Sequence, residues 1–185
     1  MIAVSSCRRP TERINSFVKD LSHSLRNSIV IRRGKMSLRE LVDSAVDRGA
    51  DRLLTVSRRY GGPGAIHLQR LKDGDAHLTY PVIFLRSVRL RREYPIEGRF
   101  FAEAVTANDG KIELDLSNPL ARFLDLPFLS GGGTFSSFHV ARDSSRRLSI
   151  CLTSPAAVRE VGPSFAVHHL SWNLLETEDD EGHES

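Results

Sequence analysis

Apolar residues in the first half of the chain fall into short strand-like runs separated by stretches with helical spacing. Ile2 to Ser6 forms the first run. After it, Pro10-Thr11-Glu12 is suited to a helix start, because proline is tolerated in the first helical turn. An apolar stripe with helical spacing then predicts the helix itself. Its members are Ile14, Phe17, Val18, Leu21 and Leu25. Ser28 to Ile31 is a second β-branched run, typical of a strand.

A second helix is predicted to begin at Ser37. Ser37 and Glu40 form a capping box, in which the serine hydroxyl accepts from the amide of residue 40 and the glutamate reaches back. One apolar face follows, made of Leu38, Leu41, Val42, Ala45 and Val46. Gly49 is suited to the end of this helix. Leu53 to Val56 is then a short apolar run of the kind that forms a buried, often parallel, strand.

A loop is expected at Gly61-Gly62-Pro63-Gly64, because glycine and proline interrupt regular structure. Beyond it, Ile66 to Leu71 alternates between apolar and polar residues, and Asp73-Gly74 is typical of a tight hairpin. A long strand is expected from about Leu78 to Leu90. Strands that alternate with helices in this order predict an α/β fold for the first half.

The second half is less regular. Lys111 to Leu116 alternates like a strand, and Ser117-Asn118-Pro119 offers a helix cap followed by proline. A brief helical stripe then consists of Leu120, Phe123 and Leu124. Three more strands are predicted, with Asp143-Ser144-Ser145 as a turn between the first two. They run from Phe135 to Ala141, from Leu148 to Leu152 and from Val167 to Leu174.

Each half thus opens with a strand, a serine, a proline and a helix. This recurrence suggests a duplication, and coincidence remains the alternative. We expect a single α/β domain over residues 1–185 with mixed β-sheets in two similar halves, about 1–95 and 96–176. An acidic tail, 177–185, follows.

The net charge of +3 conceals two halves of opposite sign. Residues 1–99 contain 20 Lys and Arg against 10 Asp and Glu, a balance of +10, whereas residues 100–185 have a balance of −7. A basic half indicates a polyanionic partner, and a solvated surface that serves solubility is the alternative. The excess is almost all arginine, whose planar guanidinium binds phosphate bidentately and stacks on bases.

Candidate catalytic and metal-binding groups are scarce. The seven histidines show no HExxH or other metal spacing, and the adjacent His168 and His169 are predicted to point to opposite faces of a strand, so that they cannot share one metal. Cys7 and Cys151 are too few for a disulfide framework and too far apart for a CxxC unit. Gly61 to Gly64 lacks the GxxxxGK[ST] phosphate loop, and no convincing long helix follows Gly131-Gly132-Gly133. We therefore predict that the protein is not an enzyme and uses no metal or cofactor.

The sequence also bears on the compartment. No apolar run approaches the roughly 20 residues that cross a bilayer. Met1-Ile2-Ala3-Val4 runs into serine and arginine without the apolar region of a signal peptide. We expect a cytoplasmic protein with no membrane partner.

Basic residues cluster where strands are predicted to end. The first cluster lies at a strand-to-helix junction, where free amides and the helix dipole favour an anion. Because the carboxyl ends of parallel strands meet at one edge of a sheet, we expect the clusters to converge there and bind phosphates. Tyr60 offers a face on which a base can stack. The predicted RNA-binding residues are Arg8, Arg9, Arg13, Arg33, Lys35, Arg58, Arg59 and Tyr60. RNA is favoured over DNA because the sequence has no helix-turn-helix, zinc finger or basic zipper.

Several of these segments resemble the Brix-domain family. Its opening is similar to Ser5-Ser6-Cys7-Arg8-Arg9-Pro10-Thr11, and later landmarks follow in order along nearly the whole chain. They are Arg33-Gly34-Lys35-Met36-Ser37-Leu38, Ala50-Asp51-Arg52-Leu53, the Gly61 to Gly64 segment and Glu160-Val161-Gly162-Pro163-Ser164-Phe165. The last looks like the family's Glu-[Ile/Val]-Gly-Pro-Arg-Phe signature, with Ser164 in place of the usual arginine. The short length resembles the archaeal single-domain members.

The resemblance implies a ribosome biogenesis factor that binds precursor ribosomal RNA and assists its folding, its processing or its pairing with guide RNA. It also implies two similar halves, each like the anticodon-binding domain of class IIa aminoacyl-tRNA synthetases. Because Ser164 replaces an arginine, we expect phosphate binding in the first half only. The alternative function is a scaffold whose basic half docks acidic or ribosomal protein partners.

Overall fold

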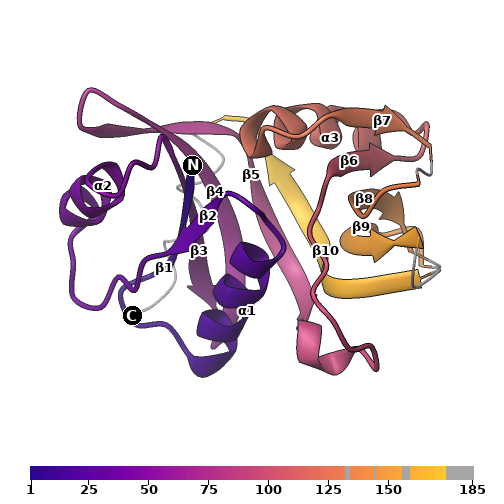
Figure 1. Cartoon of the computed structure of the whole chain (residues 1–185), viewed down its shortest axis with the longest axis horizontal. Coiled ribbons are helices and arrows are strands. Elements are labelled where there is room, and N and C mark those ends of the chain that lie inside the picture. The colour runs from indigo at the N-terminus through magenta and orange to yellow at the C-terminus, as the bar shows by residue number, and fades with distance from the viewer. Residues whose placement is uncertain (132–133, 144, 156–158, 174–185) are drawn as a thin grey trace.

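The strands of this chain form one mixed β-sheet, with helices packed on it (Figure 1). The computed structural model describes residues 1–131, 134–143, 145–155 and 159–173. The strands are β1 (Ile2–Ser6), β2 (Ser28–Val30), β3 (Arg52–Arg59), β4 (Gly62–Lys72), β5 (Asp75–Arg89), β6 (Ala104–Ala107), β7 (Phe128–Ser130), β8 (Ser137–Arg142), β9 (Leu148–Ser154) and β10 (Arg159–Ser171). The helices are α1 (Glu12–His23), α2 (Leu38–Val46), α3 (Lys111–Leu124) and the short 3-10 helix η1 (Arg91–Glu93). No helix within the described ranges is long and apolar enough to cross a membrane.

The strand order is the same in both halves when each is followed from its outer edge to the centre. The ten strands lie in the order β2-β1-β3-β4-β5-β10-β9-β8-β6-β7. In the first half β1 is parallel to β2 and β3, and in the second β6 is parallel to β7 and β8. The antiparallel pair β5–β10 joins the halves, so they share one sheet instead of forming two. This repeated connectivity is compatible with a duplication, which stays a hypothesis.

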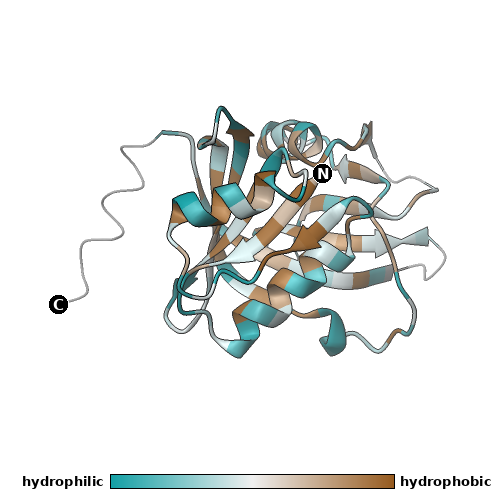
Figure 2. Ribbon diagram, turned by 60° about the vertical axis from the view of Figure 1, so that its left-hand side comes forward, coloured by the Kyte–Doolittle hydropathy of each residue, from teal (hydrophilic) through white to brown (hydrophobic). Residues whose placement is uncertain are grey.

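The helices bury two separate apolar clusters. Side chains of α1 and α3 share the larger cluster with strands of both halves, whereas α2 covers the opposite face of the first half with Leu41, Val42 and Ala45. Figure 1 shows α1 and α2 on opposite sides of the first-half strands. Coloured by hydropathy, the strands carry most of the brown segments and the helices alternate between brown and teal (Figure 2). The two halves therefore share one apolar core.

The predicted starts of the first two helices are confirmed. The Thr11 hydroxyl caps α1 by accepting from the Ile14 amide. The capping box at α2 is confirmed, with the Ser37 amide donating to Glu40 Oε2 at 2.7 Å and the Glu40 amide donating to Ser37 Oγ at 3.2 Å. The predicted apolar face of α2 is too wide, because Leu38 and Val46 are exposed.

The strand predicted from Lys111 to Leu116 is wrong, because these residues begin α3. The predicted cap at Ser117-Asn118-Pro119 is also wrong, since all three residues lie inside the helix. The Ser117 hydroxyl donates to the Glu113 carbonyl at 2.6 Å and the Asn118 amide to the Leu114 carbonyl at 3.0 Å. The strand that opens this half is β6, whose four residues are too few for a periodic signal.

The loop predicted at Gly61 to Gly64 is wrong for three of its four residues, because β4 begins at Gly62. The turn consists of Tyr60 and Gly61, with φ of 47° and 80°. Positive φ at both positions is typical of a two-residue hairpin. A Cβ at Gly64 would lie 2.8 Å from the Arg59 nitrogen, so only glycine lets the two strands approach this closely. The Asp73-Gly74 hairpin is confirmed.

Side-chain hydrogen bonds also join the two halves. The buried Arg52 of β3 donates to the Phe123 carbonyl at 2.8 Å, at the carboxyl end of α3. A cation at this end is favoured by the helix dipole. The final strand β10 begins at Arg159, earlier than predicted, and therefore contains the Glu160 to Phe165 segment. Gly132, Gly133, Ser144 and residues 174–185, which include the acidic tail, lie outside the described residues.

Candidate nucleic-acid interface

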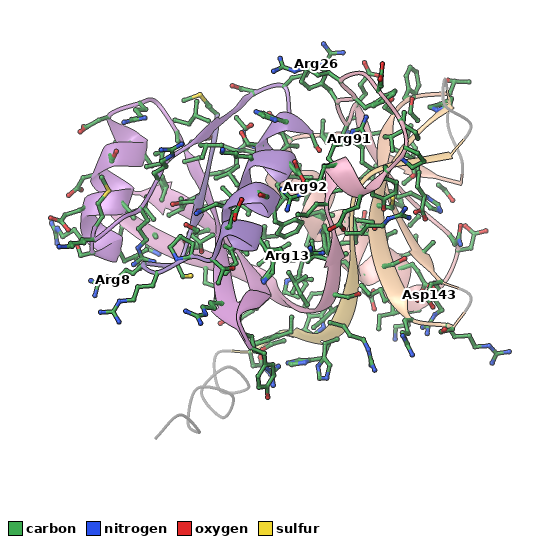
Figure 3. The ribbon with its side chains drawn as sticks, turned by 90° about the horizontal axis from the view of Figure 1, so that it is seen from below. Arg8, Arg13, Arg26, Arg91, Arg92 and Asp143 are labelled. Carbon is green, nitrogen blue, oxygen red and sulfur yellow. The ribbon has the colours of Figure 1, made fainter. Side chains whose placement is uncertain are left out.

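The basic residues predicted to bind RNA lie mainly where three neighbouring strands end at one edge of the sheet. β1 is parallel to β2 and β3, so the residues after Ser6, Val30 and Val56 lie on the same side of the molecule. Figure 3 looks onto this edge and shows Arg8 at its outer rim, pointing away from the ribbon. The edge thus gathers seven of the predicted residues, namely Arg8, Arg9, Arg33, Lys35, Arg58, Arg59 and Tyr60.

Arg8 and Arg33 come from different loops and meet at the Met36 carbonyl. Arg8 Nε donates to this oxygen at 3.3 Å and Arg33 Nε at 3.2 Å. Burial, together with the nearby positive charge of Arg8, lowers the pKa of Arg33 from its ordinary value. Guanidinium groups stay charged even so. Two like charges held this close create a positive potential that an anion would relieve.

The turn between β2 and α2 presents further cations beside this pair. The Met36 amide donates to the Arg33 carbonyl at 2.9 Å, and Gly34 adopts a positive φ of 54°. Lys35 is exposed in this turn, and Arg9 is exposed beside Arg8. Arg58 is also exposed, at the end of β3. These exposed residues carry no acidic partner among the ion pairs of the described chain.

Arg13, the remaining predicted residue, has a different environment. Its guanidinium donates to Glu93 Oε1 at 2.8 Å, to Glu93 Oε2 at 3.3 Å and to the Val88 carbonyl at 2.6 Å. In Figure 3 it lies at the middle of the edge, between α1 and the neighbouring strands. These contacts occupy several of the hydrogen-bond donors of the guanidinium group. The main role of Arg13 is therefore to connect α1 with the end of β5 and the η1 turn.

Arg59 and Tyr60 form the tip of the β3–β4 hairpin. The guanidinium carbon of Arg59 lies 5.3 Å from the centroid of the Tyr60 ring. Tyr60 is nevertheless 91% exposed, the largest exposure among the big apolar and aromatic residues of the described chain. The ring is therefore accessible to a stacking partner.

A groove of about 590 Å³ lies between this hairpin and the end of β5. The groove, which we call the hairpin groove, also contains Arg86, Ser87 and His168, which the sequence did not single out. Arg86 is an isolated arginine in a long strand and His168 one of two adjacent histidines, and neither pattern indicates a site. Their proximity to Tyr60 depends on how β5 and β10 pair, which is a long-range property. The prediction that the two histidines point to opposite faces is wrong, because a register shift in β10 next to His169 accompanies a distance of 2.7 Å between their Nδ1 atoms.

The Glu160 to Phe165 segment holds the two halves together. Val161 and Phe165 are buried in the shared apolar cluster, and the Phe165 ring packs edge-on against Phe17 at 5.7 Å. The Tyr94 hydroxyl donates to the Ser164 hydroxyl at 2.5 Å. Ser164 itself pairs with Arg89 across β10 and β5. Ser164 thus binds a neighbouring side chain, and the expectation that it contributes no phosphate contact stays a prediction.

No group of three His, Cys, Asp or Glu side chains suited to a metal ion occurs within the described ranges. Cys151 is buried, and burial followed by the negative charge of Glu160 raises its pKa to about 12. A thiol with so high a pKa is a poor nucleophile at neutral pH. The half-buried His139 has its pKa lowered by burial, and its Nδ1 lies 2.9 Å from Thr106 Oγ1.

Comparisons with known proteins find relatives that share one description. No protein-family model matches the chain. A probable Brix domain-containing ribosomal biogenesis protein of Aeropyrum pernix is 37% identical over 90 residues, which are 49% of this chain and 50% of that protein. A protein of the same description from Pyrococcus horikoshii is 34% identical over 99 residues, 53% of this chain and 43% of that protein. The matched segments therefore span about half the length of these relatives.

Two solved structures share the fold over almost the whole chain. One is a probable ribosomal biogenesis protein from Aeropyrum pernix, with a TM-score of 0.72 and 23% identity, covering 94% of this chain and 96% of that one. The other is an archaeal Imp4-like protein, with a TM-score of 0.63 and 20% identity, covering 92% and 98%. The likeness confirms a mixed α/β fold with one large sheet. The expected likeness to anticodon-binding domains is not confirmed.

Proposed function

We propose that this chain, which is similar to probable Brix domain-containing ribosomal biogenesis proteins, is a ribosome biogenesis factor of the Brix-domain family that binds precursor ribosomal RNA. The binding surface is the basic edge of the first half, formed by the loops after β1 and β2 and by the β3–β4 hairpin. Arg8, Arg9, Arg33, Lys35 and Arg58 contact phosphates there. Binding helps the RNA to fold, to be processed or to pair with guide RNA, and involves no catalysis or cofactor.

The observation that carries this proposal is the convergence of Arg8 and Arg33 on the Met36 carbonyl. Two guanidinium groups from separate loops donate to the same carbonyl oxygen, and no ion pair of the described residues joins either of them to a carboxylate. Glu40 nevertheless lies near enough to Arg8 that this charge, after the hydrogen bonds from Ser37, lowers its pKa. This arrangement suits the phosphates of a nucleic-acid backbone, because guanidinium–phosphate contacts are charge-assisted and often bidentate. Duplex RNA is bound largely through phosphates and shape, and a rigid sheet edge suits such contacts.

Crosslinking in cells followed by sequencing of the bound RNA tests the proposal. We expect precursor ribosomal RNA to be enriched, and the enrichment to fall in the Arg8→Ala/Arg9→Ala variant. Partners should be identified in parallel from nuclease-treated extract. Absence of ribosomal RNA, with protein partners that persist after nuclease treatment, would overturn RNA binding in favour of a protein scaffold.

A further inference from the structure

The pairing between β4 and β5 ends before either strand does. Their last paired residues towards this edge are Ala65 and Phe84. Beyond that point β4 continues with β3 as far as Gly62 opposite Arg59, and β5 continues with β10 as far as Arg89 opposite Ser164. The sheet therefore forks at its basic edge, and the hairpin groove is the space within this fork.

The hairpin groove combines cationic, aromatic and apolar side chains. The hairpin side contributes Arg59, Tyr60, Gly62 and Pro63, the β5 side contributes Leu85, Arg86, Ser87 and Val88, and His168 of β10 also lines the groove. Arg13 reaches the same space while it is bound to Glu93. None of the described residues that line the groove is acidic. Pro63, Leu85 and Val88 add apolar contacts beside the cations. An anion that carries a planar ring would therefore meet cationic groups for its charge and aromatic and apolar groups for its ring.

We propose that the hairpin groove binds one unpaired nucleotide of RNA, whose base stacks on Tyr60 and whose phosphate contacts Arg86. This inference rests on the proposed function, since it assigns a second, single-strand-specific site to the same basic edge. Arg59 lies over one face of the Tyr60 ring, and the base occupies the opposite face. A volume of about 590 Å³ is in the range of sites for small molecules and accommodates a nucleotide.

The physical reason for single-strand preference is steric. Bases within an A-form duplex are stacked on each other, and their faces are closed to protein side chains. A nucleotide in a loop or bulge can present its base to an aromatic ring, and the loss of one such stack corresponds to about 1–3 kcal/mol. The arginines after β1 and β2 bind flanking phosphates regardless of pairing, so the edge as a whole joins helical and looped RNA.

The test compares two RNA probes with four forms of the full chain. The probes are a 12-nucleotide single strand with a central 2-aminopurine and the same strand annealed to its complement. The proteins are the wild type, Tyr60→Ala, Tyr60→Phe and the control Phe135→Ala, which removes an exposed aromatic from the second half. We expect Tyr60→Ala to weaken single-strand binding about tenfold and duplex binding less than twofold. Tyr60→Phe and Phe135→Ala should bind like the wild type.

Stacking also has a spectroscopic signature. Emission from 2-aminopurine should be quenched by the wild type and by Tyr60→Phe, and not by Tyr60→Ala. Arg86→Gln should weaken single-strand binding and reduce its salt slope by about one unit. Equal losses for both probes in Tyr60→Ala, or no loss, would overturn the groove assignment while RNA binding stands. The same loss with heparin, a polyanion without bases, would also overturn it. If the wild type binds neither probe, the proposed function fails and the groove assignment with it.

Discussion

Arg13 forms a two-contact ion pair with Glu93, a residue 80 positions later in the chain. Arg13 lies in the first turn of α1, and Glu93 ends the η1 turn that follows β5. The Leu90 amide donates to the same carboxylate at 2.9 Å, and the Arg91 amide donates to Asp20 of α1 at 2.8 Å. These contacts tie α1 to the junction between the halves.

Arg13→Ala is therefore expected to act mainly on stability. The pair is partly exposed, so its loss should lower the free energy of unfolding by about 1 kcal/mol. Denaturant unfolding measures this, with Arg9→Ala as a control that should change stability by less than about 0.5 kcal/mol. RNA affinity should fall less in Arg13→Ala than in Arg8→Ala. Unchanged stability with a large loss of RNA affinity would contradict this role.

The same pair predicts a pH dependence. The hydrogen bond from Arg13, followed by that from the Leu90 amide, lowers the pKa of Glu93 below its ordinary value. A lowered pKa in the folded state stabilises the protein above the ordinary pKa, and this contribution is lost as the pH falls through the folded value. The stability difference between wild type and Glu93→Gln should be constant above about pH 5 and shrink at lower pH. A difference that grows on acidification would contradict the pairing.

Gly162 makes room for the Tyr94 ring. Its φ is 66°, and a Cβ placed there would overlap the ring. Gly162→Ala should therefore destabilise the protein by about 3 kcal/mol through strain and overpacking. The double variant Gly162→Ala/Tyr94→Ala should lose less than the sum of the two single changes, since the overlap is removed. Additive losses in thermal or denaturant unfolding would show that the two residues do not compete for space.

The two cysteines should differ in reactivity. Cys151 is buried with its pKa raised to about 12, whereas Cys7 is partly exposed. Because the thiolate is the reactive form, an alkylating reagent at pH 8 should modify Cys7 and leave Cys151 intact in the folded protein. Peptide mass spectrometry follows both sites, and denaturant should make Cys151 reactive. Equal rates in the folded protein would contradict its burial at the β9–β10 pairing.

Local chemistry in the sequence predicted local structure well. The Ser37–Glu40 capping box and the Asp73-Gly74 turn each depend on residues a few positions apart, so they were recognisable without the fold. Lys111 to Leu116 was misassigned because three alternating apolar residues at the start of a helix imitate a strand. Only the packing of this segment against β6 and β8 distinguishes a helix from a strand here.

The candidate site was predictable to the extent that it depends on strand direction. Parallel β1, β2 and β3 bring their basic loops to one edge, as arginines after successive strands indicated. The ion pair of Arg13 and the fork between β4 and β5 were not predictable. Both depend on β5, whose paired residues in β10 lie 75 to 89 positions later in the chain.

The central claim is that the arginines after β1 bind RNA phosphates, and salt dependence tests it most directly. Affinity for a ribosomal RNA fragment should be measured between about 50 and 200 mM salt for wild type, Arg8→Ala/Arg9→Ala and the control Arg122→Ala/Arg147→Ala, whose exposed arginines lie in the second half. We predict that Arg8→Ala/Arg9→Ala binds more weakly and that its slope of log affinity against log salt is shallower by about 1.5 units. The control should keep the wild-type slope. Full affinity and an unchanged slope in Arg8→Ala/Arg9→Ala would contradict the assignment.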